Sequence, residues 1–139
     1  MFSKIMVPID LGHADKLTAA LTVAADLAKA YDCELCYVGV TASAPGKVAH
    51  NPAEYAEKLS AFAQNQGALS GQKASGHAVV THDPAIDMDD ALVQAVADVG
   101  ADLVVMASHI PNIADALWPS HGGRLASHSA ASVFLVRAS

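Results

Sequence analysis

The chain has 139 residues, a length at which one domain can bury a hydrophobic core and fold unaided. Apolar residues make up 53% of it and aromatic residues only 5%, so the core is expected to consist of aliphatic side chains. The formal net charge of -6, with 8 scattered lysines and arginines, argues against binding to nucleic acid, whose phosphates are also anionic. We expect a single domain over residues 1–139.

The sequence shows no pattern for export or for a membrane span. The apolar run before Asp10 is too short for a signal peptide, and no stretch reaches the roughly 20 apolar residues that cross a bilayer. Cys33 and Cys36 enter a predicted strand rather than a helix start, so we interpret them as ordinary buried cysteines and not as a redox pair. The expected location is the cytoplasm.

Strand patterns and helix patterns alternate along the chain. Runs of β-branched residues predict strands, and apolar residues at helical spacing predict helices between them. In chain order the predictions are a strand over Lys4–Ile9, a helix from about His13 to Tyr31, a strand over Glu34–Val40, a helix from Pro52 that Gly67 or Gly71 ends, a strand over Gly76–Thr81, a helix from Pro84 to Gly100, a strand over Leu103–Met106, a short helix within Ser120–Ala131 and a strand over Val133–Val136.

Two helix starts carry the same signal, a capping residue followed by proline. Asn51 precedes Pro52 and Asp83 precedes Pro84, and proline suits the first helical position because it lacks the N–H that would be unpaired there. Five strands alternating with four helices imply right-handed crossovers and a doubly wound parallel sheet of the α/β class. The apolar faces of the second and third helices are expected to use Tyr55, Leu59, Phe62, Ile86, Val93, Val96 and Ala97.

Three segments of the chain carry a resemblance to one known family. KIMVPIDLGHADKLTAAL, in which Pro-x-Asp ends the predicted strand, is similar to the first strand and helix of the universal stress protein family. THDPAIDMDDALVQAVADVGADLVVMASH is similar to a later strand, helix and fourth strand, and PSHGGRLASHSAASVFLVR resembles the last helix and strand. The resemblance implies an adenine nucleotide alpha hydrolase-like fold with strand order 3-2-1-4-5, and a ligand crevice where the carboxyl ends of strands one and four meet.

The resemblance also implies a site for an adenine nucleotide. Pro8 and Asp10 are expected near the adenine, and Val40 is expected to contact it through its backbone. Nucleotide-binding members use GxxG after the fourth strand, and later Gly followed by Ser or Thr at a helix start, so that backbone amides can approach the phosphates. The other expected contacts are Ala107, Ser108, His109, Ser120, His121 and Gly122.

This chain departs from the family's glycine pattern at three positions. Ala107, Ile110 and Pro119 stand where the family has Gly, and of this pattern only Ser120 remains. Pro119 removes a backbone donor, while the other two add side chains to the phosphate path. We therefore expect a weakened site, for AMP more readily than for ATP (with Mg²⁺).

Two functions remain open. One is a non-catalytic regulatory or stress-response protein with a nucleotide site, and the other is a nucleotide-independent module of the same fold that binds an unknown protein partner. No catalytic residue is predicted, because adjacent Ser-His pairs rarely have the geometry of a nucleophile and its base, and GxSxG and P-loop patterns are absent. No metal site is predicted either, because the histidines lack metal-ligand spacing.

The last predicted strand indicates a homodimer. In the family's strand order it lies at an edge of the sheet, and it contains neither a charge nor a proline that would discourage pairing. The resemblance implies that the same strand of a second copy pairs with it antiparallel about a two-fold axis. The expected interface residues are Val133, Phe134, Leu135 and Val136.

Overall fold

The computed structural model describes residues 1–109 and 121–137. These residues form five strands and four α-helices, with one 3-10 helix after the first strand. The strands are β1 (Lys4–Pro8), β2 (Glu34–Ala42), β3 (Ala74–Thr81), β4 (Leu103–His109) and β5 (Ser132–Arg137). The helices are the 3-10 helix Leu11–Lys16, α1 (Thr18–Tyr31), α2 (Pro52–Ser70), α3 (Pro84–Val99) and α4 (His121–His128).

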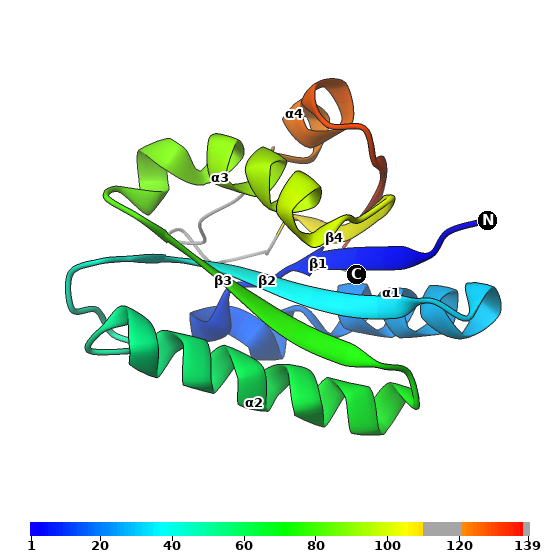
Figure 1. Cartoon of the computed structure of the whole chain (residues 1–139), viewed down its shortest axis with the longest axis horizontal. Coiled ribbons are helices and arrows are strands. Elements are labelled where there is room, and N and C mark those ends of the chain that lie inside the picture. Colours follow the sequence, from blue (N-terminus) through cyan, green and yellow to red (C-terminus); the bar gives the residue numbers. More distant parts are fainter. Residues whose placement is uncertain (110–120, 138–139) are drawn as a thin grey trace.

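All five strands lie in one parallel sheet in the order β3-β2-β1-β4-β5. Helices α1 and α2 cover one face of this sheet, and α3 and α4 cover the other (Figure 1). The three central strands are buried on both sides, as is typical of parallel sheets between two helix layers. This confirms the predicted doubly wound α/β fold and its strand order.

The two predicted helix caps are present. The Asn51 side chain accepts a hydrogen bond from the Glu54 backbone N–H, and the Asp83 side chain accepts one from the Ala85 N–H. Gly71 and Gly100 end α2 and α3 in the left-handed backbone region, with φ of 74° and 71°. Local chemistry therefore fixes both boundaries of these two helices.

Two helix predictions were wrong in detail. The first helix was expected from about His13, but a 3-10 helix with a kink at His13 comes first and α1 begins at Thr18. The side chains of Ile86 and Ala97 were expected to be buried, yet both are exposed, that of Ile86 to 79%. The sequence of α3 carries two apolar stripes, and the helix turns the stripe with Met88 and Leu92 inward instead of the one with Ile86.

Both cysteines are buried and free, and burial raises the pKa of each thiol. Buried thiols with raised pKa values are typical of core packing. Within the described residues, no helix has the length and apolar character needed to span a membrane.

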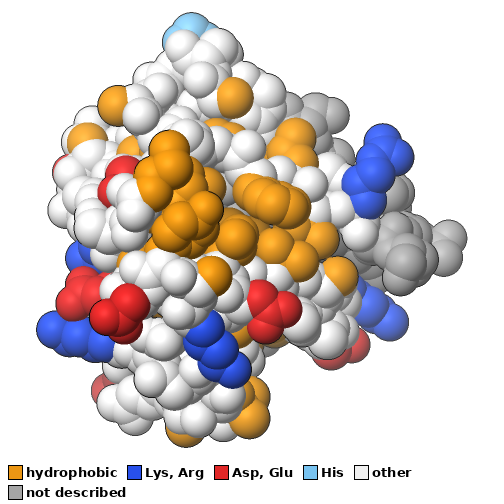
Figure 2. Space-filling view, turned by 90° about the vertical axis from the view of Figure 1, so that its right-hand side faces the viewer, with side chains coloured by type: hydrophobic (Ala, Val, Ile, Leu, Met, Phe, Trp, Pro, Cys, Tyr) orange, Lys and Arg blue, Asp and Glu red, His pale blue; other side chains and the backbone are white. Residues whose placement is uncertain are grey.

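Hydrophobic side chains are also exposed at the surface. They gather in a patch on the side of the molecule that lies to the right in Figure 1, where the N-terminus is found (Figure 2). At the N-terminus, Phe2 packs edge-on against Tyr31, with ring centroids 5.2 Å apart. On the edge strand β5, Phe134 and Leu135 are each 45% exposed. Apolar surface of this kind is available for contact with another protein.

Candidate functional site: a cleft at the carboxyl ends of the strands

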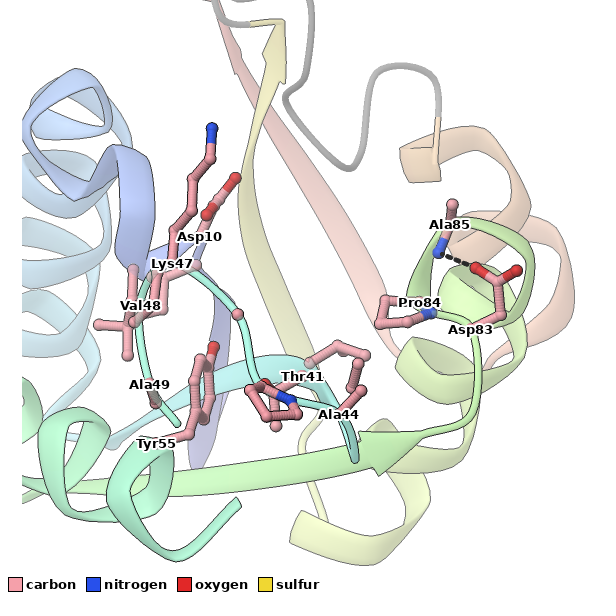
Figure 3. Close-up of a pocket in the computed structure, with 16 residues that line it drawn as sticks. Asp10, Thr41, Ala44, Lys47, Val48, Ala49, Tyr55, Asp83, Pro84 and Ala85 are labelled. Carbon is pink, nitrogen blue, oxygen red and sulfur yellow. Dashed lines mark hydrogen bonds between the residues drawn. The ribbon is translucent and has the colours of Figure 1, made fainter. Parts of the chain in front are cut away.

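A cleft of about 360 Å³ opens at the carboxyl ends of β1 and β2 (Figure 3). Its walls come from residues 9–11 after β1, residues 40–42 of β2, residues 44–49 of the following loop, and residues 83–85 at the start of α3. Tyr55, in the first turns of α2, lies at its base. This is the end of the sheet at which doubly wound folds bind their ligands.

The cleft exists because β1 ends before β2 does. The last paired residues are Pro8 and Val38, and Ile9 N–H still donates to the Val38 carbonyl at 2.8 Å. Backbone groups of alternate residues in a strand point to the same side, so those of Val40 point toward the space that β1 has left. Within the described residues, no backbone hydrogen bond fills that position. Val40 thus presents a donor and an acceptor to the cleft.

Asp10 shapes the turn by which the chain leaves the sheet. Its carboxylate accepts hydrogen bonds from Gly12 N–H at 3.1 Å and from the His13 ring nitrogen Nδ1 at 2.9 Å. The Asp10 side chain is 11% exposed and caps the 3-10 helix that moves the chain away from β2. Asp10 is therefore both a turn former and part of the cleft wall.

Tyr55 closes the base of the cleft, and Gly39 makes room for it. A Cβ atom at Gly39 would lie 2.1 Å from Tyr55 Oη, so only glycine permits this approach. Burial, and after it the negative charge of Asp10, raise the pKa of the Tyr55 hydroxyl, which keeps it protonated. Within the described residues this hydroxyl has no hydrogen-bond partner. It can serve as a donor to a ligand.

Of the nine expected contact residues, Asp10 and Val40 line the cleft. Pro8 is buried at the end of β1, next to the cleft wall. Ala107 is 6% exposed and part of the core, and Ser108 beside it is half-buried; neither lines the cleft. The register of β1 with β4 pairs Ile5 with Leu103, and its continuation would bring Asp10 level with Ser108. Ala107 and Ser108 therefore belong to the side of β1 that faces away from Val40.

The other expected contacts belong to the last third of the chain. His109 ends β4 and His121 begins α4, while Ser120, Ile110 and Pro119 lie outside the described residues. Gly122 is buried beneath β5, because a Cβ atom there would lie 2.2 Å from a methyl carbon of Leu135. Gly122 thus lets α4 pack closely against the edge strand.

Tyr55 and Lys47 are among the cleft residues that sequence reasoning did not predict. Tyr55 was expected only as a core residue of the second helix, and no role was predicted for Lys47. A glycine amid bulky strand residues, followed by a tyrosine early in the next helix, is the pattern that could have indicated Tyr55. For Lys47 no sequence signal is evident, because loop paths depend on tertiary contacts.

The described residues offer no evident metal site, since nowhere among them do three His, Cys, Asp or Glu side chains gather. The described charges of the cleft are those of Asp10, Lys47 and Asp83. An arrangement with a backbone edge, a protonated hydroxyl and few charges can bind a flat heterocycle by hydrogen bonds and apolar contact.

Several solved structures are similar to the chain along nearly its whole length. A universal stress protein in complex with cAMP has 22% sequence identity and a TM-score of 0.69, covering 99% of this chain and 98% of that one. A universal stress protein from Archaeoglobus fulgidus in complex with dAMP has 20% identity and a TM-score of 0.63, covering 96% of each chain. A family protein from Arabidopsis thaliana with AMP bound has 15% identity and a TM-score of 0.63, covering 99% and 92%.

At these identities the similarity establishes the shared fold. A comparison with curated proteins finds no match. A model of the universal stress protein family, however, matches residues 1–137, which is almost the entire chain. The chain therefore belongs to the universal stress protein family.

Proposed function

We propose that this chain is a non-catalytic regulatory or stress-response protein that binds an adenine nucleotide, with reduced affinity, in the cleft beside Val40. The observation that carries the proposal is the backbone edge of Val40, which no described residue pairs with on the side of β1. Adenine has an amino donor at N6 next to an acceptor at N1, and a strand edge offers the complementary acceptor and donor side by side.

The rest of the cleft suits a nucleoside. Its volume of about 360 Å³ falls within the range of small-molecule sites, and Ile9, Val40 and Ala49 give it apolar walls. Three proteins of the same fold are solved with cAMP, dAMP or AMP. These ligands share an adenine and a single phosphate group, and this is the ligand class that we propose here.

The expected weakness comes from the phosphate side. Ala107, Ile110 and Pro119 replace the family's glycines, so fewer backbone amides are available to a phosphate chain. The start of α3 does not replace them. Asp83 accepts a hydrogen bond from the Ala85 N–H through its side chain and from the Ile86 and Asp87 N–H groups through its carbonyl. A long phosphate chain therefore contributes less binding free energy in this protein than the adenosine moiety does.

Calorimetric titration of AMP, ADP and ATP, with and without Mg²⁺, into protein stripped of nucleotide tests the proposal. We expect saturable binding of AMP that is at least as tight as that of ATP. Ala42→Phe, which fills the cleft at the end of β2, should abolish binding, whereas Ala61→Phe on the exposed face of α2 should not. Absence of heat and of a thermal shift at millimolar nucleotide would contradict the proposal and favour the nucleotide-independent module. ATP turnover that Ala42→Phe abolishes would contradict the non-catalytic assignment.

We further propose that two copies pair along β5. This strand is an edge of the sheet, and Phe134 and Leu135 expose apolar surface there. Val133 is half-buried and Val136 is 8% exposed, so these two side chains pack mainly within the subunit. No other described strand pairs with the outer side of β5, so a second copy would pair with its backbone groups there and cover the exposed side chains.

A further inference from the structure

The charged side chains of the cleft differ in whether other described residues bind them. Among the described residues that line it, the carboxylates of Asp10 and Asp83 and the ammonium group of Lys47 carry formal charge. The Asp10 carboxylate accepts hydrogen bonds from Gly12 and His13, and the Asp83 carboxylate caps α3 through Ala85 N–H. Lys47 makes no ion pair or hydrogen bond through its side chain within the described part of the chain.

The loop that carries Lys47 is held in place at the cleft by hydrogen bonds. A hydrogen bond of 3.0 Å from Gly46 N–H to the Ala49 carbonyl closes a tight loop with Lys47 and Val48 at its tip. Lys58 of α2 donates a hydrogen bond to the Val48 carbonyl and forms an ion pair with Glu54 at 3.2 Å. The loop that carries Lys47 is therefore fixed from the side of α2.

The same loop is also packed against the end of β1. A methyl carbon of Val48 lies 3.4 Å from the point that a Cβ atom of Gly12 would occupy, so the loop tip reaches the turn after Asp10. In Figure 3 the Lys47 side chain extends beside Asp10, while Asp83 and Ala85 lie across the cleft. Lys47, which has no side-chain partner among the described residues, is thus placed at one wall of the cleft, opposite the start of α3.

We infer that Lys47 is the residue by which the cleft binds a phosphate-bearing adenine nucleotide more tightly than the neutral nucleoside. The inference rests on the proposed function, and it assigns to this chain a phosphate contact from the β2–α2 loop. A side-chain ammonium group needs no glycine, since it acts as a point charge that reaches the anion from its own flexible stem. Because the loop is already held in place, little conformational entropy is lost in ordering it when the anion binds.

The test is a calorimetric comparison of AMP with adenosine in three variants and the wild type. Lys47→Met removes the charge and keeps the length of the side chain, and Lys47→Arg restores the charge. Lys29→Met is the matched control, because Lys29 is exposed near the end of α1, away from this cleft. We expect Lys47→Met to weaken AMP binding about five- to tenfold, as for one partly solvated ion pair, and to leave adenosine binding within about twofold of the wild type.

The remaining outcomes separate the two proposals. Lys47→Arg and Lys29→Met should keep the preference for AMP, and higher salt should weaken AMP binding less in Lys47→Met than in the wild type. If both ligands bind but Lys47→Met leaves the ratio of their affinities unchanged, the role of Lys47 is refuted while the proposed function stands. Equal losses for AMP and adenosine would likewise refute it, since they would show a structural effect on the cleft. If neither ligand binds to the wild type, the proposed function and the inference fail together.

Discussion

Gly39 of β2 sets the position of the Tyr55 ring, and through it the depth of the cleft. A methyl group at this position would lie 2.1 Å from Tyr55 Oη and 2.9 Å from the ring carbon that bears it. Tyr55 is only 4% exposed, so its ring cannot move without disturbing its neighbours. We predict that Gly39→Ala lowers the free energy of unfolding by about 1 to 3 kcal/mol, the usual cost of overpacking a core. Urea denaturation measures this change.

Gly46→Ala is the matched control for that substitution. A Cβ atom at Gly46 meets no atom within 4 Å, and the backbone there lies outside the left-handed region. This substitution should leave the free energy of unfolding unchanged or raise it by up to about 1 kcal/mol, because alanine lowers the conformational entropy of the unfolded chain. Equal stability of Gly39→Ala and Gly46→Ala would mean that the Tyr55 ring has room elsewhere and does not depend on Gly39.

The cleft residues also show how far single positions can be predicted. Asp10 and Val40 could be named because the resemblance to universal stress proteins implies that both contact the adenine, and both line the cleft. Lys47 could not, because its position depends on how the loop after β2 packs onto α2 and the turn after β1. Such packing leaves no period or motif in the sequence.

At the scale of elements, Asp102 joins the starts of three strands. Its carboxylate accepts hydrogen bonds from Ser3 N–H at 2.9 Å, Ser3 Oγ at 3.0 Å and Lys4 N–H at 3.1 Å, just before β1. Its backbone N–H donates to the Lys4 carbonyl, and its carbonyl accepts from Ser132 N–H at the start of β5. The segment Gly100-Ala101-Asp102 thus has a physical role, since Gly100 ends α3 and Asp102 aligns β4 between its two neighbours.

We predict that Asp102→Asn lowers the free energy of unfolding by roughly 1 to 2 kcal/mol at pH 7. An amide keeps one acceptor but turns an NH₂ group toward donors, and the loss is moderated because the site is partly solvated. Burial by itself would raise the pKa of Asp102, but the hydrogen bonds from Ser3 and Lys4 outweigh it and hold the pKa below its usual value of 3.8. Chemical denaturation across a pH series measures both effects.

The stability difference between the wild type and Asp102→Asn should become smaller as the pH is lowered. A carboxyl group with a lowered folded-state pKa contributes stability that is complete above its unfolded-state pKa of about 4 and is lost as the pH falls through the folded-state value. The difference between wild type and Asp102→Asn should therefore be constant from about pH 5 to 7 and shrink below about pH 4. Asp26 is exposed on α1, and Asp26→Asn should have the same stability as the wild type throughout this pH range. A gap that persists undiminished to the lowest pH would rule out the charge as its source.

The elements themselves were predictable to the extent that local chemistry fixes them. The caps Asn51 and Asp83 begin α2 and α3 where the sequence indicated, and Gly100 ends α3 as predicted. For the end of α2 the sequence offered Gly67 or Gly71, and the helix ends at Gly71. The start of α1 was wrong because the side chain of Asp10 stabilises a 3-10 helix that competes with a longer α-helix. The buried face of α3 was wrong for Ile86 because two apolar stripes fit one helix, and only the sheet beneath decides between them.

At the scale of the whole molecule, the sheet has two edges that differ in what they expose. β3 forms one edge and β5 the other. Val80 on β3 is 48% exposed, while β5 exposes both Phe134 and Leu135 at 45%. Two neighbouring exposed side chains, one of them aromatic, give β5 the larger apolar surface, which is the kind of anchor that protein interfaces use.

We predict that the wild-type protein is a dimer in solution and that Phe134→Lys makes it a monomer, as measured by light scattering at micromolar concentration. A lysine at this position would put a charge from each copy into the paired edge, which strongly disfavours strand pairing. Val80→Lys is the matched control, because it makes the same kind of change at a side chain of similar exposure on the other edge. It should remain a dimer. If Val80→Lys is a monomer while Phe134→Lys remains a dimer, the interface lies at β3 and not at β5. If the wild-type protein is a monomer, the prediction is wrong and the apolar surface of β5 is one for a different protein.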